Sequence, residues 1–202
     1  MLTVAQLLEP LSRHRTDEVV VTTMSVVRPW GRLSDSDLDF ASADSAMGHT
    51  ADLALGIALA QPSRRVVCLN GDGSMLMCLG TLATAVDVRA ANYVLVVCDN
   101  GVYEITGHQP VAASGQIDYA AMAEAVGFRT VHHFDDARAW AEAVPELLRE
   151  SGPTFVHVRT EPGDQGPIGR RPEEEARYLQ HSLAEWSGIM RDALAAAPSV
   201  RT

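Results

Sequence analysis

Positive charge is scarce in this chain. Its 202 residues contain 16 Lys and Arg against 26 Asp and Glu, so the formal net charge is −10 at pH 7. Nucleic acids and anionic membrane surfaces attract basic proteins, and this balance therefore argues against both as partners. Long apolar runs are also missing, because none approaches the roughly 20 residues that span a bilayer. The first residues lack the basic flank and apolar core of a signal peptide, so we expect neither a membrane segment nor export.

Cysteine is rare as well. The chain has three, Cys68, Cys78 and Cys98, and two of them belong to apolar runs. Secreted domains that depend on disulfides carry more cysteines, usually in even number. We therefore expect reduced thiols, packed as small apolar side chains, in a cytoplasmic protein.

Apolar runs of strand length are what the chain has instead. Residues 65–69 and 93–97 are aliphatic or β-branched without alternation, which is typical of strands covered on both faces, as in a parallel sheet. With the length of one domain and 47% hydrophobic residues, the chain is predicted to be α/β, a doubly wound and mainly parallel sheet with helices on both faces. Strands are expected at 18–23, 65–69, 93–97, 128–132 and 154–158, and helices at 3–15, 48–60, 119–126, 136–149 and 173–197, with Asp118 and Asp135 as helix caps.

Two stretches are predicted to be irregular. Residues 24–44 are long and polar, and we expect them to form a loop near a functional site or a partner chain. Residues 161–172 are rich in turn formers. We expect residues 1–160 to form one ligand-binding domain. Residues 161–202 would add a connector and a C-terminal helix that packs on this domain or on a partner subunit.

The chain is organised around two short peptides, residues 70–74 (Asn-Gly-Asp-Gly-Ser) and residues 98–103 (Cys-Asp-Asn-Gly-Val-Tyr). Each follows a predicted buried strand, and the 26 residues from Ser74 to Asp99 fit one strand–helix–strand crossover. The carboxyl ends of parallel strands meet at one edge of the sheet, where such sheets bind ligands. We therefore expect the two peptides to lie side by side.

The side chains of these peptides favour a hard cation and an anion. Asp72 offers a carboxylate oxygen, Asn100 an amide oxygen, and the carbonyl of Val102 a third ligand. Oxygen ligands without Cys or His favour magnesium or calcium over zinc, and magnesium commonly shares its shell with phosphates. Gly71 and Gly73 allow a ligand to approach the backbone closely. With Ser74 at the start of a helix, the pattern predicts a magnesium–diphosphate site.

This pattern resembles the signature of the thiamine-diphosphate (ThDP) enzymes, in which Gly-Asp-Gly is followed about 26 residues later by Asn. The segments 45–49, 53–60, 62–67 and 106–109 are similar to one branch, the sulfopyruvate and phosphonopyruvate decarboxylases, and more loosely to acetolactate synthase. The resemblance covers roughly Val19 to Val158. One departure is Asp99, where many relatives have a second Asn, although the phosphonopyruvate-like branch tolerates Asp.

The resemblance implies a role for individual residues. Asp72, the Asn100 side chain and the Val102 carbonyl would hold Mg²⁺. Met47 would lie under the bent cofactor, and the Ser45 carbonyl would accept a hydrogen bond from its pyrimidine amine. The full set of implied cofactor residues is Thr23, Ser45, Met47, Gly71, Gly73, Ser74, Tyr103 and Ile105, although Thr23 is as readily explained as the end of a strand.

Three polar side chains are candidates for contact with a substrate. His49 follows the cofactor-facing Met47, and its alternative is a helix-capping or supporting role. Glu104 and His108 follow the metal-binding Asn100 and could act as acid or base, or simply belong to an exposed polar loop. The doublet at 132–133 has no third metal-type ligand nearby in the sequence, and we interpret both histidines as structural.

What the chain lacks decides the expected assembly. ThDP enzymes bind the cofactor between a diphosphate-binding (PP) domain and a pyrimidine-binding (PYR) domain, and a glutamate of the PYR domain activates the cofactor. Every motif above resembles the PP half. The resemblance therefore implies a separate PYR-domain subunit that carries the glutamate, in an assembly of two of each chain or larger, as in two-subunit sulfopyruvate decarboxylase.

The activity implied is decarboxylation of a small 2-oxoacid with ThDP and Mg²⁺, giving an aldehyde, with this chain as the β subunit. Carboligation in the manner of acetolactate synthase shares every motif. Two further alternatives are the β subunit of a 2-oxoacid:ferredoxin oxidoreductase, which would need cysteine ligands for an iron–sulfur cluster, and a non-catalytic scaffold subunit.

Overall fold

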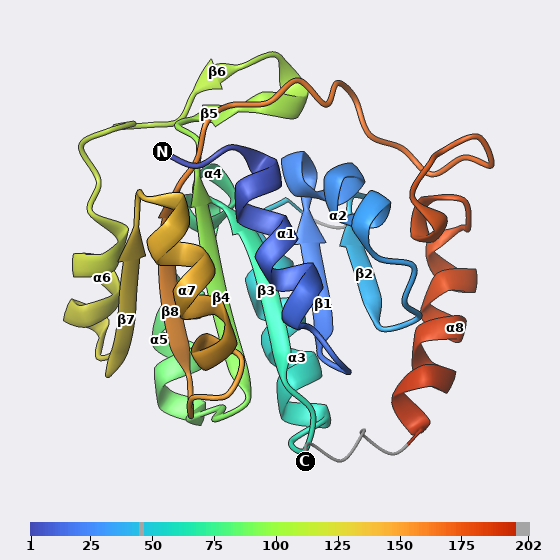
Figure 1. Cartoon of the computed structure of the whole chain (residues 1–202), viewed down its shortest axis with the longest axis horizontal. Coiled ribbons are helices and arrows are strands. Elements are labelled where there is room, and N and C mark those ends of the chain that lie inside the picture. Colours follow the sequence, from blue (N-terminus) through green and yellow to red (C-terminus); the bar gives the residue numbers. More distant parts are fainter. Residues whose placement is uncertain (45–46, 197–202) are drawn as a thin grey trace.

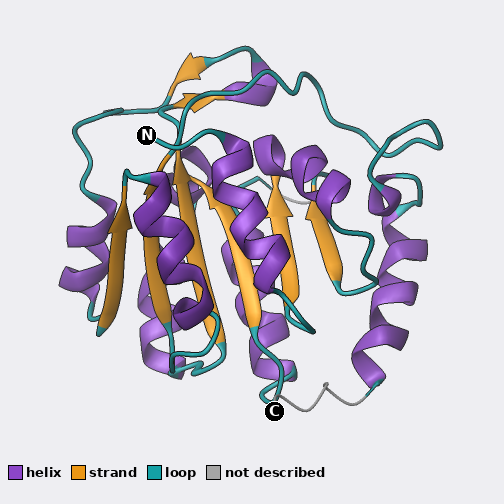
Figure 2. Cartoon of the chain, in the orientation of Figure 1, coloured by secondary structure: helices purple, strands orange, loops and turns teal. Residues whose placement is uncertain are grey.

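The computed structural model describes residues 1–44 and 47–196, and its centre is a six-stranded, fully parallel sheet (Figure 1). The strand order is β2-β1-β3-β4-β8-β7. The strands are β1 (Val19–Thr23), β2 (Asp39–Ser42), β3 (Val66–Gly71), β4 (Tyr93–Asp99), β7 (Thr130–Phe134) and β8 (Thr154–Arg159). A two-stranded antiparallel ribbon, β5 (Val102–Tyr103) with β6 (Gln109–Pro110), lies beyond the carboxyl ends of these strands (Figures 1 and 2).

Helices cover both faces of the sheet, so the predicted doubly wound α/β fold is confirmed (Figure 1). One face carries α1 (Val4–His14), α2 (Val27–Leu33) and α7 (Ala137–Leu147), and the other carries α3 (Thr50–Ala60), α4 (Asp72–Met77), α5 (Gly80–Val88) and α6 (Tyr119–Val126). A last helix, α8 (Leu183–Ala195), lies beside the edge strand β2. None of these helices, within the described ranges, is both long and apolar enough to cross a membrane.

The two strands that lead to the predicted site lie side by side, as expected. β3 and β4 pair in parallel from Val66↔Tyr93 to Gly71↔Cys98. Their aliphatic side chains are almost completely buried because helices cover both faces. From β1 the chain goes outward to β2 and then returns to β3, so the direction of winding reverses between β1 and β3. Parallel sheets open a crevice at such a point, beyond the carboxyl ends of the strands.

The stretch from 24 to 44 is not the long loop that its polarity suggests. It contains a 3₁₀ turn (η1, Met24–Val26), the helix α2 and the edge strand β2. Only Val27 and Trp30 of α2 are buried, so the apolar face of this seven-residue helix is too short to give a visible period. β2 is buried along its whole length although two of its four residues are polar.

The C-terminal helix starts later than residue 173. α8 begins at Leu183, after Ser182, whose side chain accepts from the Glu185 amide while the Glu185 side chain accepts from the Ser182 amide. This reciprocal capping box fixes the start of the helix. Before it stands a short 3₁₀ turn (η3, Arg177–Leu179). Similarly, the cap of α7 is Asp136 rather than Asp135, whereas Asp118 caps α6 as predicted.

The segment after β8 is tied to the sheet's β2 edge. The Arg28 guanidinium of α2 forms two 2.8 Å hydrogen bonds with the two carboxylate oxygens of Glu174. Gly31 of α2 has no room for a side chain, because an added Cβ would meet the Ala176 Cβ at 2.3 Å. Trp186 of α8 is buried, and its indole N–H donates to the carbonyl of Asp39 in β2 at 2.6 Å. Residues 174–190 therefore complete the core at that edge.

Replacing Trp186 by Ala should lower the free energy of unfolding by about 3 to 5 kcal/mol, because it empties a fully buried site and leaves the Asp39 carbonyl without its donor. Urea unfolding followed by circular dichroism measures the change. Arg191→Ala, at an exposed position of the same helix, should change stability by less than about 0.5 kcal/mol. Equal stability of the Trp186→Ala and wild-type chains would show that α8 does not belong to the cooperative core.

Candidate functional site

A cleft opens at the carboxyl ends of β1, β3 and β4, and the residues predicted to bind cofactor and metal come together there. Its lining includes the strand end of β1, the turn into α4, the peptide after β4 and the loop before α3. Of the predicted residues it contains Thr23, Met47, Gly71, Asp72, Gly73, Ser74, Asn100, Val102, Tyr103, Glu104 and Ile105. The predicted Ser45 contact lies outside the described residues. Met24, Ser25 and Met77 also line the cleft and were not predicted.

Asp72 is a buried carboxylate, and no cationic side chain in the described part of the chain is bonded to it. Its Oδ2 accepts from the Gly101 amide at 2.9 Å, which ties the turn after β3 to the turn after β4. Burial is the main cause that raises the pKa of Asp72 to about 7; hydrogen bonds from the Gly73 and Gly101 amides lower the pKa, and the negative charge of Asp99 raises it. A carboxylate held in this way is a good ligand for a cation, since a bound cation would supply the missing counter-charge.

Asp99 is the better stabilised of the two acids. Burial alone would raise its pKa, but the hydrogen bond and charge of His157, with the hydrogen bond from Asp72, lower it below the usual value. The His157 Nε2 lies 3.0 Å from the Asp99 Oδ2, and its Nδ1 lies 2.9 Å from the Nδ1 of His133. A line of polar side chains therefore runs from Asp72 through the sheet to exposed His133 on the outer strand β7. Both histidines at 132–133 are hydrogen-bonded, His132 to Glu150 and His133 to His157.

Asn100 is oriented by both ends of its amide. Its Oδ1 accepts from the Val102 amide at 3.1 Å, which leaves one lone pair for a metal. Its Nδ2 donates to Glu104 at 3.1 Å.

Glu104 is itself buried, at 5% exposure, and its carboxylate accepts from the amides of Gly163 and Gln165. Glu104 therefore holds the connector after β8 against the turn that carries Asn100. Of the two interpretations given for Glu104, its burial contradicts the exposed polar loop.

The turn from β3 into α4 leaves one hydroxyl unsatisfied. The Ser74 Oγ is buried and has no hydrogen-bond partner within the described chain, and Ser74 is one of the residues that line the cleft. Buried hydroxyls usually have a partner, so this atom suits a ligand oxygen. Gly73 packs so closely on Tyr103 that an added Cβ would meet the ring at 2.3 Å. The backbone at Gly73 is thus pressed against Tyr103 beside Ser74.

Two of the three predicted substrate contacts lie outside the lining of the cleft. His49 directly precedes α3, and its Nδ1 pairs with Asp52 at 2.6 Å. His108, in the loop between η2 (Glu104–Thr106) and β6, is exposed, and its Nε2 lies 2.8 Å from the Gly163 carbonyl. Met47, by contrast, lines the cleft and is 67% exposed, so its side chain is accessible to an apolar ligand.

Sequence reasoning missed the support of this site. His157 is one polar residue in the apolar run of β8, and that pattern was the available signal for a buried partner of Asp99. The amides of Gly163 and Gln165 donate to Glu104, which lies about 60 residues earlier in the sequence, and no local sequence pattern predicts such a contact.

Comparisons with known proteins agree with this geometry. The family model described as "Thiamine pyrophosphate enzyme, C-terminal TPP binding domain" matches residues 38–158. A phosphonopyruvate decarboxylase of Streptomyces viridochromogenes is 40% identical over 82% of this chain and 42% of its own length. The sulfopyruvate decarboxylase subunit beta of Methanothermobacter thermautotrophicus is 36% identical over 95% of this chain and 100% of its own.

Solved structures show the same fold. The ThDP-dependent 4-hydroxybenzoylformate decarboxylase of Rhodococcus jostii aligns with a TM-score of 0.66 at 24% identity, over 81% of this chain and 33% of that one. The chain thus spans less than half the length of the phosphonopyruvate decarboxylase and of this structure, but the whole of the sulfopyruvate decarboxylase subunit.

Replacing Asp72 by Asn should stabilise the metal-free chain. The pKa of Asp72 in the folded chain is about 7, above the ordinary 3.8. At pH values between 3.8 and 7, Asp72 therefore keeps its proton in the folded chain and has lost it in the unfolded chain. Stability therefore falls as pH rises through this window, and the full cost is present above about pH 7. The Asn variant should gain roughly 2 to 4 kcal/mol at pH 8 and almost nothing near pH 4.

Urea unfolding in EDTA at both pH values tests this difference. Asp87→Asn, which neutralises an exposed carboxylate on α5, is the matched control and should change stability by less than about 0.5 kcal/mol. If Asp72→Asn were no more stable than wild type at pH 8, burial of the Asp72 carboxylate would not lower the free energy of unfolding.

Proposed function

The chain belongs to the thiamine pyrophosphate (ThDP) enzymes, as their C-terminal TPP-binding domain, and on this premise we propose that it is the PP-domain subunit of a split 2-oxoacid decarboxylase. The enzyme uses ThDP and Mg²⁺, resembles sulfopyruvate and phosphonopyruvate decarboxylase, and needs a second subunit to act. In this proposal residues 1–160 form the domain that binds cofactor and metal, and residues 161–196 form a connector and a C-terminal helix that packs on this domain at β2.

One observation carries the proposal: a hydroxyl without a partner and a set of cation ligands face the same cleft. The Ser74 Oγ is unsatisfied, and the oxygens of Asp72 and Asn100 stand at the ends of neighbouring strands. Carboxylate, amide and carbonyl oxygens suit Mg²⁺, which often completes its shell with phosphate oxygens. The residues present therefore fit a magnesium diphosphate, with Asp72, Asn100 and the Val102 carbonyl on the metal.

The other lining residues have distinct tasks in the proposal. Met47 and Ile105 provide apolar contact for the rings of the cofactor, and Thr23, Gly71, Gly73 and Tyr103 shape the wall around the diphosphate. When bound, ThDP supplies the carbon nucleophile and the electron sink that let a 2-oxoacid lose carbon dioxide. Glu104 is a positioning residue, because its carboxylate orients the Asn100 amide.

The size of the cleft supports a second subunit. It holds about 100 Å³, whereas pockets that enclose a small ligand measure roughly 300 to 1,000 Å³. Its two carboxylates, Asp72 and Glu104, are both engaged in hydrogen bonds inside the chain. In this proposal the glutamate that activates the cofactor comes from a separate PYR-domain chain, by analogy with the two-subunit sulfopyruvate decarboxylases among the relatives. A PYR-domain chain would close the open side of the cleft, and the assembly we propose is a hetero-oligomer of two of each chain or larger.

The substrate in this proposal is a small 2-oxoacid with a second anionic group. Two phosphonopyruvate decarboxylases and three sulfopyruvate decarboxylase β subunits are among the relatives. His108 is the substrate contact that this chain offers most readily, since its exposed ring lies on the loop beyond Ile105. His49 would have to leave Asp52 to reach the cleft. The remaining contacts with the second anion belong to the partner chain.

Carboligation is the second candidate, since acetolactate synthase large subunits are also among the relatives, at 29% to 33% identity. An iron–sulfur oxidoreductase is not supported, because Cys68 and Cys98 are buried inside β3 and β4.

Asp72→Ala should abolish Mg²⁺-dependent binding of ThDP in the presence of the PYR-domain chain, while circular dichroism shows a folded domain. Ser74→Ala should weaken binding about tenfold, because a hydrogen bond to a charged group contributes roughly 1.5 kcal/mol or more. Ser187→Ala on α8 is the control and should bind as wild type does. Calorimetric titration measures all four proteins. Normal binding by Asp72→Ala would remove the metal assignment.

The chain alone should release no carbon dioxide from sulfopyruvate, phosphonopyruvate or pyruvate, whereas the chain mixed with its PYR-domain partner should turn over at least one of them. Product analysis then distinguishes the two reactions, because decarboxylation gives an aldehyde and carboligation gives a hydroxyketone. Turnover by this chain without a partner would overturn the split assembly, and binding of ThDP without turnover in the mixture would favour a scaffold role.

A further inference from the structure

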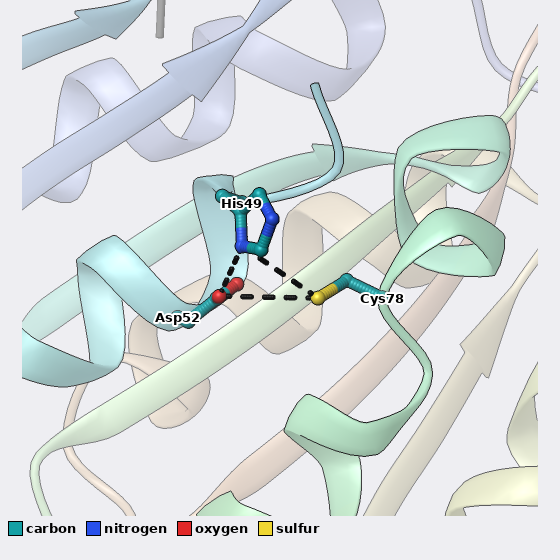
Figure 3. Close-up of side chains that lie close together, drawn as sticks. All are labelled: His49, Asp52 and Cys78. Atoms are coloured by element: carbon teal, nitrogen blue, oxygen red, sulfur yellow. Dashed lines mark hydrogen bonds and ion pairs between the residues drawn. The ribbon is translucent and has the colours of Figure 1, made fainter. Parts of the chain in front are cut away.

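Three side chains with metal-binding atoms meet where α3 begins and α4 ends (Figure 3). His49 and Asp52 come from the start of α3, and Cys78 from the end of α4. The His49 Nδ1 lies 2.6 Å from the Asp52 Oδ2, and the Cys78 Sγ lies 3.7 Å and 3.8 Å from these two atoms. We propose that this cluster is a second metal site, for a thiophilic divalent ion such as Zn²⁺.

The ligand set separates this site from the magnesium site. Asp72, Asn100 and Val102 offer oxygen only, which suits hard cations that prefer octahedral shells. His49, Asp52 and Cys78 offer one nitrogen, one oxygen and one sulfur. Imidazole and thiolate favour Zn²⁺ and its tetrahedral surrogate Co²⁺ and are poor ligands for Mg²⁺. The two sites therefore select different ions from the same solution.

The distances already approach those of a tetrahedral shell. With Zn–S of about 2.3 Å and Zn–N or Zn–O of about 2.0 to 2.1 Å, sulfur lies about 3.5 Å from each light ligand, and nitrogen about 3.3 Å from oxygen. The sulfur distances of 3.7 Å and 3.8 Å need almost no change. The 2.6 Å separation of nitrogen and oxygen has to open by less than 1 Å, which a χ rotation of either exposed side chain provides.

Charge and proton balance at the site are simple. The Cys78 thiol gives up its proton to the solvent when the metal binds, as coordinating thiols do. Before the metal binds, the carboxylate of Asp52 accepts a hydrogen bond from the Nδ1–H of His49. On binding, this proton leaves Nδ1 and Nε2 takes one up from the solvent, so that the lone pair of Nδ1 binds the ion and the imidazole stays neutral. Zn²⁺ with one thiolate and one carboxylate is neutral, so the site needs no further counter-charge. One proton is released for each ion bound.

The surroundings leave room for the ion and orient one ligand. The Thr81 hydroxyl of α5 donates to the Asp52 Oδ1 at 3.3 Å, which directs the other carboxylate oxygen toward His49 and Cys78. Supporting contacts of this kind raise metal affinity. The His49 and Asp52 side chains are 53% and 38% exposed, so solvent reaches the cluster and supplies the fourth ligand.

Binding at this cluster would act on the wall of the cofactor cleft. Gly48 packs so closely on α4 that an added Cβ would lie 2.7 Å from the Met77 Cβ and 3.5 Å from the Ser74 carbonyl. Met47, Gly48, Ser74 and Met77 all line the cleft. An ion that joins His49 to Cys78 therefore fastens the loop that carries Met47 to the helix that carries Ser74.

Cobalt absorption tests the site directly. The full chain, without ThDP and with excess Mg²⁺ to fill the oxygen site, is titrated with Co²⁺. A thiolate-to-cobalt charge-transfer band and the visible bands of a tetrahedral ion should appear and saturate at one equivalent. Cys78→Ser should abolish the charge-transfer band, and His49→Gln and Asp52→Asn should weaken Co²⁺ binding by at least about tenfold. His132→Gln, which breaks a histidine–carboxylate pair that has no thiol beside it, is the matched control and should bind as wild type does.

Thiol labelling gives an independent measurement. Cys68 and Cys98 are buried and Cys78 is partly exposed, so a thiol reagent should modify one cysteine in the native chain. Zn²⁺ should slow that reaction in wild type and His132→Gln but not in His49→Gln. Absence of the cobalt band, or equal protection in every variant, would overturn the proposal and leave a hydrogen-bonded cluster. Neither result depends on ThDP binding, so failure here is distinct from failure of the proposed function.

Discussion

Asp72 and Asp99 place two carboxyl groups next to each other at the buried ends of β3 and β4, and the site is built around this contact. Burial raises the pKa of Asp72 to about 7, and the negative charge of Asp99 acts in the same direction, so Asp72 is partly protonated near neutral pH. His157 assigns the charge to Asp99, because it bonds to that carboxylate and not to Asp72. Asp72 is left as the group whose ionisation requires an added positive charge. A divalent cation on its free side satisfies that requirement, and the Gly101 amide at 2.9 Å already fixes the orientation of the carboxylate.

The centre of the site was accessible from the sequence, and its support was not. Asp72 and Asn100 follow apolar runs that are typical of buried parallel strands, and the pairing of β3 with β4 brings the ends of these strands together. The fate of Glu104 could not be predicted, because its hydrogen-bond donors are backbone amides in an irregular segment, and every residue has such an amide. The helix α2 was hidden for a different reason. Its buried side chains, Val27 and Trp30, are too few to show a period, and Pro29 and Gly31 between them are typical of loops.

Arginine explains how the irregular segment after β8 is held without regular hydrogen bonding. The sequence contains no lysine, and its 16 basic residues other than histidine are all arginine. A guanidinium has five donors in a planar fork and can hold several carbonyls at once. Arg28 donates to the carbonyls of Gln165 and Pro167 as well as to Glu174, and Arg170 donates to those of Ala41 and Tyr178. These contacts fasten the connector over the carboxyl ends of the strands, where its amides reach Glu104. The orientation of Asn100 thus depends on a segment far along the chain.

The two walls of the cleft differ in how they are fixed. The wall of Asp72 and Asn100 stands on the paired strands β3 and β4, and the Gly101 amide and Glu104 link its turns, so a ligand there meets a nearly preformed surface. The other wall is the loop before α3 that carries Met47. This loop contacts α4 through Gly48, whose φ of +86° and lack of a side chain allow the close approach. His49, Asp52 and Cys78 lie beside that contact, and their interactions join the start of α3 to the end of α4. A ligand at the cluster would therefore act on the position of Met47 in the cleft and leave Asp72 and Asn100, the proposed magnesium ligands, unchanged.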